Sequence, residues 1–153
     1  MAKDLEVAIL FADVVGSTQL YDQFGDSKAS ETVARCLDIM KDSTHRFNGT
    51  VIKTIGDEVM STFPSADQAM GAADQMQKHI SSGVDDINVS IRIGCHFGPV
   101  VQEQNDIFGA AVHTANRMTS QAKSKQVIIS GTTVDQMSEE WRGAGGLHRQ
   151  DSV

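Results

Sequence analysis

The chain has 153 residues, of which 40% are hydrophobic and 22% charged, and its formal net charge is −7. This composition is typical of one soluble globular domain that is long enough to bury a core. An acidic chain is a poor candidate for nucleic-acid binding, because phosphate backbones attract a surplus of Lys and Arg.

No apolar run approaches the roughly 20 residues of a membrane helix, and the N-terminus lacks the positive segment and long apolar core of a signal peptide. We therefore expect a cytoplasmic domain that contacts neither nucleic acid nor membrane, although a longer protein containing it could be membrane-attached. Cys36 and Cys95 lie in apolar stretches outside any CxxC pair or zinc-finger spacing. They are expected to be buried free thiols, which fits a reducing compartment.

The first predicted element is a strand over residues 6–15, an almost continuous apolar and β-prone run that is typical of a strand buried on both faces. Asp13 lies near its end. Gly16 then permits a tight turn, and Ser17 or Thr18 could cap a following helix.

The middle of the chain predicts two helices around a hairpin. Helical periodicity covers residues 27–47, and residues 50–55 and 58–63 are β-prone. Gly56-Asp57 between the two strands predicts a two-residue hairpin turn. A second helix begins after Pro64-Ser65, and its apolar face extends to Ile80. Ser65 and Gln68 make a capping box for it.

The remaining elements complete an order of β-α-β-β-α-β-α-β. Residues 89–97 alternate as a strand that Gly98-Pro99 is expected to end. A helix over 110–123, a strand over 127–130 and a short helix around 131–137 follow. This order predicts an α+β fold, a ferredoxin-like α/β sandwich with helices packed on a mixed sheet, as a single domain over residues 1–153. The polar, Gly-rich stretch 143–153 suggests that the domain is truncated at its C-terminal end.

Two aspartates, Asp13 and Asp57, each end an apolar β segment. Taken singly, each is better explained as a turn or N-cap residue. As a pair they fit a magnesium site, since Mg²⁺ commonly uses one or two carboxylates together with substrate phosphates. The start of a helix directly after Asp13 offers backbone N–H groups to an anion. The pair and the helix start together indicate a site for a nucleotide polyphosphate.

Three blocks of the sequence, FADVVGST (11–18), IKTIGDEVMSTF (52–63) and NDIFGAAVHTANRM (105–118), resemble the signature blocks of class III adenylyl and guanylyl cyclases in sequence, order and spacing. The resemblance extends from about residue 5 to residue 138. It implies a homodimer that converts ATP to cyclic AMP and pyrophosphate with two Mg²⁺ or Mn²⁺ ions, at active sites that lie between the protomers.

The resemblance also implies residue roles. Asp13 and Asp57 would bind the two metal ions, helped by the backbone carbonyl of Val14. Lys53 and Asp106 match the pair that selects adenine, where guanylyl cyclases usually carry Glu and Cys. Arg117 would stabilise the transition-state phosphate. The residues implied to lie along the triphosphate are Phe11, Val14, Val15, Gly16, Ser17 and Thr18.

Three features depart from the family pattern. His113 stands where the family usually has an asparagine that orients the ribose, so we expect His113 to act there, with activity that could be lower or pH-dependent. The segment between Phe97 and Asp106 is short. The chain also stops before the strand and Lys-Gly segment with which a family domain usually continues.

Two alternatives to an adenylate cyclase remain at this point. The domain could be a non-catalytic cyclase-homology module that senses nucleotide or only dimerises. It could also be a phospho-acceptor signalling domain with Asp13 as the acceptor, although the predicted hairpin over 50–63 argues against the regular βα alternation of that fold.

Overall fold

The central strand of the fold is β1 (Lys3–Val15), because its residues 8–12 are all apolar and at most 3% exposed. The computed structural model describes residues 2–142 and 147–150. In it, β1 pairs antiparallel with β3 (Glu58–Phe63) on one side and with β4 (Ser90–Glu103) on the other. Outside this group, β2 (Thr50–Ile55) extends the sheet beyond β3. The order β2-β3-β1-β4 is that of a ferredoxin-like sheet.

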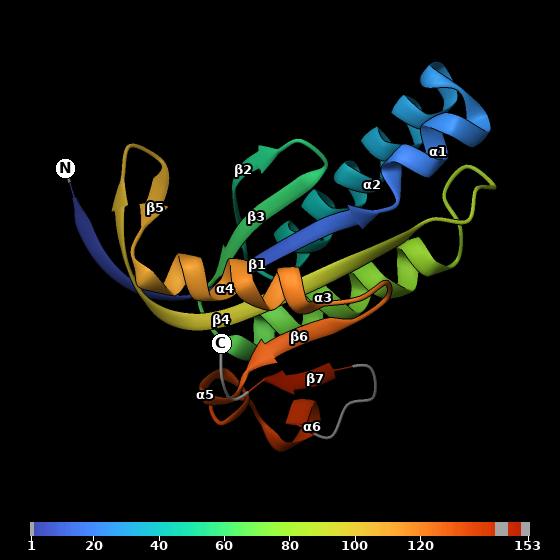
Figure 1. Ribbon diagram of the computed structural model, residues 1–153. Coiled ribbons are helices and arrows are strands. Elements are labelled where there is room, and N and C mark those ends of the chain that lie inside the picture. Colours follow the sequence, from blue (N-terminus) through green and yellow to red (C-terminus); the bar gives the residue numbers. More distant parts are fainter. Residues whose placement is uncertain (1, 143–146, 151–153) are drawn as a thin grey trace.

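Two strands with parallel pairing make the sheet mixed, and a third extends it. β6 (Val127–Ser130) runs parallel to β4, and β7 (Leu147–Gln150) runs parallel to β6. The short strand β5 (Asp106–Phe108) pairs with the far end of β4 and forms a hairpin arm with it (Figure 1). The predicted α+β sandwich on a mixed sheet is confirmed.

Helices cover both faces of this sheet. α2 (Asp26–Arg46) and α3 (Ala66–Ser81) lie against one face, and α4 (Ala110–Gln121) lies across the other (Figure 1). Side chains alternate along β1, so that Leu10 packs under α2 and α3 while Ile9 and Phe11 pack on the α4 side. α4 comes very close to β4, because a Cβ atom at Gly94 would overlap the backbone of Thr119.

The helix caps differ in part from expectation. Ser65 is the N-cap of α3 and accepts a hydrogen bond from the backbone N–H of Gln68, as predicted. The side chain of Gln68, however, bonds to the hydroxyl of Ser65 and not to its backbone N–H. The prediction that Ser17 or Thr18 caps the first helix is wrong. The N-cap of α1 (Ser17–Phe24) is Gly16, whose φ of 72° is a conformation that glycine adopts without strain.

Proline does not end the fourth strand, so this prediction is also wrong. Pro99 lies inside β4, opposite Glu6 of β1. On its other side, pairing with β6 stops at Cys95 and pairing with β5 begins only at Val101. A proline is tolerated there because that edge of β4 has no neighbouring strand to bond with at this position.

Several small elements were not predicted. The helix start predicted after Asp13 is α1, whereas β5, α6 (Glu139–Arg142) and β7 were missed. The predicted helix 131–137 is shorter, as α5 (Gly131–Val134). Most of the predicted polar end, 143–153, lies outside the described residues, but Leu147–Gln150 within it is β7. No helix in the described part of the chain is both long and apolar enough to cross a membrane.

Candidate functional site

The two aspartates meet at one end of the sheet. Asp13 is on β1, and Asp57 is in the turn between β2 and β3. The backbone N–H of Val14 donates to the backbone carbonyl of Asp57 at 3.2 Å, which ties the hairpin turn to the end of β1. The pKa of Asp13 is raised, first by burial and then by the negative charge of Asp57. Two carboxylates that repel each other in a half-buried place form a site that a cation would stabilise.

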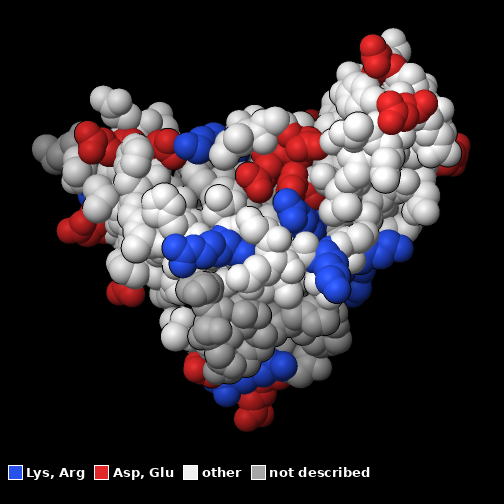
Figure 2. Space-filling model, viewed as in Figure 1, with Lys and Arg blue, Asp and Glu red and all other residues white. Residues whose placement is uncertain are grey.

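Two further charged residues complete this cluster, and the sequence did not reveal their roles. In the strand register, Asp13 lies between Glu58 of β3 and Arg92 of β4. Arg92 donates from Nε to Oδ2 of Asp13 at 3.2 Å, and its Nη2 forms an ion pair with the same oxygen at 3.1 Å. Its Nη1 approaches the backbone carbonyl of Ser120 on α4 at 3.5 Å. Figure 2 shows a basic side chain directly beside a central acidic group.

The alternation of residues along β4 could have indicated that Arg92 belongs to a functional site. It is a cation on the strand face that carries Gly94 and His96, opposite the apolar stripe. That face could not be matched to Asp13 without knowing which strands are neighbours.

The donor set fits a divalent metal. Asp13 and Asp57 supply the carboxylate oxygens that Mg²⁺ and Mn²⁺ prefer, and the carbonyl of Val14 is adjacent in the chain. Within residues 2–142, no group of three or more His, Cys, Asp or Glu side chains is arranged to hold an ion by itself. A magnesium site completed by substrate phosphates needs only one or two carboxylates.

Glu58 predicts how stability depends on pH. Burial, followed by the charges of Asp13 and Asp57, raises the pKa of Glu58 to about 7, from an ordinary 4.5. The folded protein therefore holds this proton more tightly than the unfolded chain, and stability is lost as pH rises from about 4.5 to about 7. In metal-free buffer we expect E58Q to raise the Tm by about 5 °C near pH 8, with the difference shrinking toward pH 5. Thermal unfolding of both proteins across this range tests the prediction, and a pH-independent difference would contradict it.

The segment after Asp13 is only partly exposed. Gly16 and Thr18 are exposed, and no side chain caps the start of α1, which leaves its first N–H groups for an anion. Val14 is buried under α2 and α3, so only its backbone faces the site. Phe11 is 3% exposed and packs beside Met60 in the core on the α4 side.

Lys53 and Asp106 form an ion pair, with Nζ of Lys53 2.9 Å from Oδ2 of Asp106. The Lys53 hydrogen bond, helped by one from the backbone N–H of Ile107, lowers the pKa of Asp106. Next to the pair is a groove of about 320 Å³, whose walls include Ile52 and Ile107. The pair thus joins the edge strand β2 to the hairpin arm.

A β-bulge determines the direction of Lys53. Val51 pairs with Ser61, but Lys53 pairs with Met60, so Ile52 is an extra residue in β2. Strict alternation would put Lys53 on the same face as Val51. The bulge instead puts it on the α4 face, which is also the face of Asp13.

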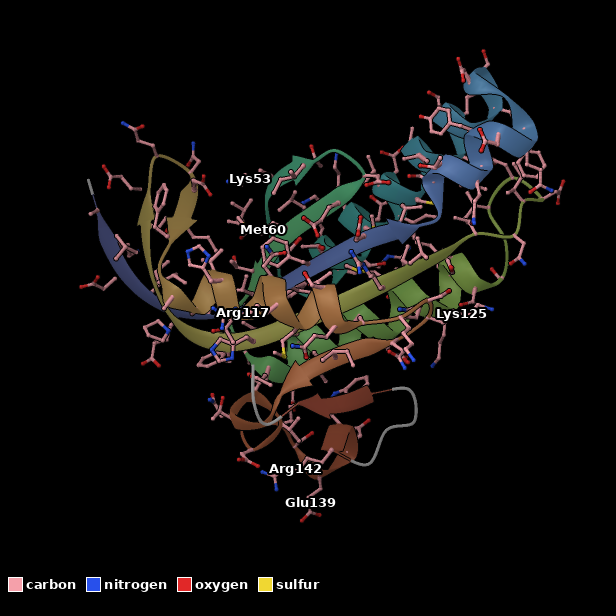
Figure 3. The ribbon with its side chains drawn as sticks, in the orientation of Figure 1. Lys53, Met60, Arg117, Lys125, Glu139 and Arg142 are labelled. Carbon is pink, nitrogen blue, oxygen red and sulfur yellow. The ribbon has the colours of Figure 1, made fainter. Side chains whose placement is uncertain are left out.

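His113 and Arg117 are exposed on α4, one turn apart. Figure 3 shows Arg117 on α4 and Lys53 on β2, on the same side of the sheet. The structure therefore places the charged residues predicted for the site, and His113, in two groups, whereas the side chains of Phe11 and Val14 are buried in the core. Asp13 near the end of β1 and Asp57 in the β2–β3 turn form the first group. The second group consists of the Lys53–Asp106 pair and of His113 and Arg117 on α4.

The chain is similar to known cyclases. The family model of the adenylate and guanylate cyclase catalytic domain matches residues 1–145. An adenylate cyclase of Streptomyces coelicolor is 30% identical over 135 residues, which are 88% of this chain and 35% of that protein. The chain thus spans about a third of the length of this curated relative.

Solved structures agree with this similarity. The catalytic core of a rhodopsin-guanylyl cyclase with converted specificity, in complex with ATPαS, is 25% identical with a TM-score of 0.83, covering 91% of this chain and 85% of that one. A non-canonical dimeric guanylyl cyclase domain from the fungus Blastocladiella emersonii is 25% identical with a TM-score of 0.78, covering 88% and 84%. The chain belongs to the family of adenylate and guanylate cyclase catalytic domains.

Proposed function

We propose that residues 1–153 form a single catalytic domain of an adenylate cyclase, which converts ATP to 3′,5′-cyclic AMP and pyrophosphate in intracellular signalling. The observation that carries the proposal is the meeting of Asp13 and Asp57 on the sheet face that also bears the Lys53–Asp106 pair. One group suits metal-bound phosphates and the other suits a purine.

Each group has a chemical task. Asp13 and Asp57 would hold two Mg²⁺ or Mn²⁺ ions with the carbonyl of Val14. Metal ions there would supply positive charge that lowers the pKa of the ribose 3′-hydroxyl and neutralises pyrophosphate. Gly16, Ser17 and Thr18 line the triphosphate with backbone N–H groups, and Val15 borders it.

On the second group, Asp106 accepts from the N6 amino group of adenine and Lys53 donates to a ring nitrogen. The guanidinium of Arg117 stabilises charge that develops on the α-phosphate, and His113 orients the ribose.

The two groups act on one substrate only across a homodimer. One protomer supplies Asp13 and Asp57, and its partner supplies the purine pair and the arginine, so a symmetric dimer contains two such sites. The exposure of His113 and Arg117 on α4 supports this arrangement, because both side chains remain available to a second protomer.

Purine selection is tested by replacing both Lys53 and Asp106 with the residues usual in guanylyl cyclases. We expect the wild-type domain with Mn²⁺ to form cyclic AMP from ATP about 5- to 150-fold more efficiently than cyclic GMP from GTP, because a hydrogen-bonded match discriminates by about 1–3 kcal/mol. K53E combined with D106C should remove most of this preference, since Glu and Cys suit guanine. The measurement is kcat/KM for both nucleotides.

An unchanged ratio would refute purine selection by this pair. Absence of any cyclic nucleotide from either substrate would instead favour the alternative, a non-catalytic module for nucleotide sensing or dimerisation. Exchange of Lys123, an exposed lysine away from the pair, serves as the control for loss of surface charge.

A further inference from the structure

A hydrogen-bonded chain of side chains joins β4 to β6 and α5. Nδ1 of His96 lies 2.6 Å from Oγ of Ser130, and that oxygen lies 2.7 Å from Oγ1 of Thr133. The chain ends where the backbone N–H of Phe97 donates to Oγ1 of Thr133 at 2.7 Å. His96 is half-buried, Ser130 is 6% exposed and Thr133 is fully buried. None of these residues has a role in the proposed catalytic site.

The side chains continue the contact between β4 and β6 where backbone pairing ends. The last paired residues are Cys95 and Ile129, and His96 and Ser130 come next on the two strands. β6 has only four residues, and α5, α6 and β7 follow it and lie together on one side of the sheet (Figure 1). Met137 packs separately in the main core, so loss of the chain would open this part locally without unfolding the domain.

The direction of hydrogen bonding in the chain requires His96 to be neutral. Thr133 accepts from Phe97, and within the described residues its own buried proton has one acceptor, the hydroxyl oxygen of Ser130. Ser130 therefore donates to Nδ1 of His96, which places the ring proton on Nε2. A doubly protonated ring would donate from Nδ1 instead, and one buried hydroxyl proton would then lose its acceptor.

The surroundings of His96 also favour the neutral ring. Burial lowers the pKa of His96 from its ordinary 6.5, and the residue opposite it on β1 is the apolar Ile9. Asp13 and Arg92 are each four positions further along their strands and are paired with each other. The charged or titratable residues that neighbouring elements carry are Lys3 and Asp13 on this face of β1, Arg92 on this face of β4, the exposed His113 and Arg117 on α4, and His148 and Arg149 on β7.

We propose that His96, Ser130 and Thr133 form an acid-sensitive latch, which holds β6 and α5 against β4 while His96 is neutral and releases them when His96 is protonated. The folded chain binds this proton more weakly than the opened chain does. The latch is therefore fully stable above about pH 6.5 and loses stability as the pH falls below that value. Release would free the segment that follows α4, the helix that carries His113 and Arg117.

The experiment follows amide hydrogen exchange in the metal-free domain between about pH 8 and pH 5, with rates corrected for the intrinsic pH dependence of exchange. Amides of β1 report global unfolding and serve as the internal reference. In the wild type, the amide of Phe97 should lose about three- to thirtyfold of its protection relative to β1 by pH 5. The upper limit is that of a histidine with a pKa of about 6.5 in the opened state.

Three variants separate the latch from a general effect of acid. His96→Asn keeps an acceptor near the position of Nδ1 but does not titrate, so the relative protection of Phe97 should not depend on pH. Ser130→Ala interrupts the chain and should lower this protection at every pH. His79→Gln removes an exposed histidine from α3, and this matched control should behave as the wild type.

Nitrogen NMR of the wild-type imidazole rings adds a measurement that needs no variant. We expect the neutral ring of His96 to carry its proton on Nε2 and its pKa to lie below 6.5. A neutral ring protonated on Nδ1, or a pKa at or above 6.5, would overturn the latch. Unchanged protection of Phe97 in the wild type at pH 5, or equal pH dependence in His96→Asn, would overturn it as well. Because no readout uses nucleotide or metal, the latch and the proposed function are tested separately.

Discussion

Asp57→Ala should reduce cyclic AMP formation by roughly a thousandfold or more with either Mg²⁺ or Mn²⁺, because one carboxylate of a two-carboxylate metal site is removed and Asp13 alone cannot hold both ions. The fold should persist. The structural hydrogen bond at this position runs from the N–H of Val14 to the backbone carbonyl of Asp57, which alanine retains. Loss of the repulsion between Asp57 and Asp13 should also make the metal-free domain no less stable.

The measurement combines kcat with direct binding of Mn²⁺, followed by electron paramagnetic resonance, and with the Tm. Asp57→Asn keeps the shape of the side chain and should lose activity nearly as severely, since the charge binds the ion. Asp42→Ala, which removes an exposed carboxylate from α2 on the opposite face, is the matched control and should retain full activity. Turnover of Asp57→Ala within tenfold of the wild type would contradict the metal assignment.

The sequence was sufficient to predict that Asp13 and Asp57 lie together, but not that Glu58 and Arg92 lie beside them. A hairpin between two β-prone segments puts Asp57 at a sheet end, and the apolar run before Asp13 ends at the same kind of place. Glu58 and Arg92 join them only because β3 and β4 both flank β1 in a register that local sequence does not specify. Strand neighbours are set by the whole chain, so a contact between residues 13 and 92 has no signal in either segment.

Lys53 shows a second limit of the sequence. Its alternation with Val51 and Ile55 predicts one face of a regular strand, and the bulge at Ile52 puts it on the other. Asn-Gly or Gly-rich turns mark hairpins from local sequence, but no local pattern marks this extra residue. Pro99 is a similar case, because its place inside β4 depends on where β6 and β5 stop pairing.

Mixing two inactive variants should restore activity if the active site lies between protomers. Asp57→Ala disables the metal half, and Arg117→Ala disables the half contributed by α4, where the exposed side chain allows the change without loss of packing. In a dimer that contains one copy of each variant, one site carries both defects and the other carries neither. Random pairing makes half of the dimers mixed, so about one quarter of all sites should be intact.

The expected result is therefore about a quarter of the wild-type cyclic AMP formation from a co-refolded equimolar mixture, at equal total protein, against almost none from either variant alone. Asp13→Ala mixed with Asp57→Ala is the matched control. Both changes fall in the same half of the site, so every dimer, mixed or not, has two defective metal sites, and no activity should return. If the first mixture stays as inactive as this control, the metal aspartates and Arg117 do not meet across a dimer. Activity would then have to arise within one protomer, and a single ATP molecule would have to contact both groups of residues on the same sheet face.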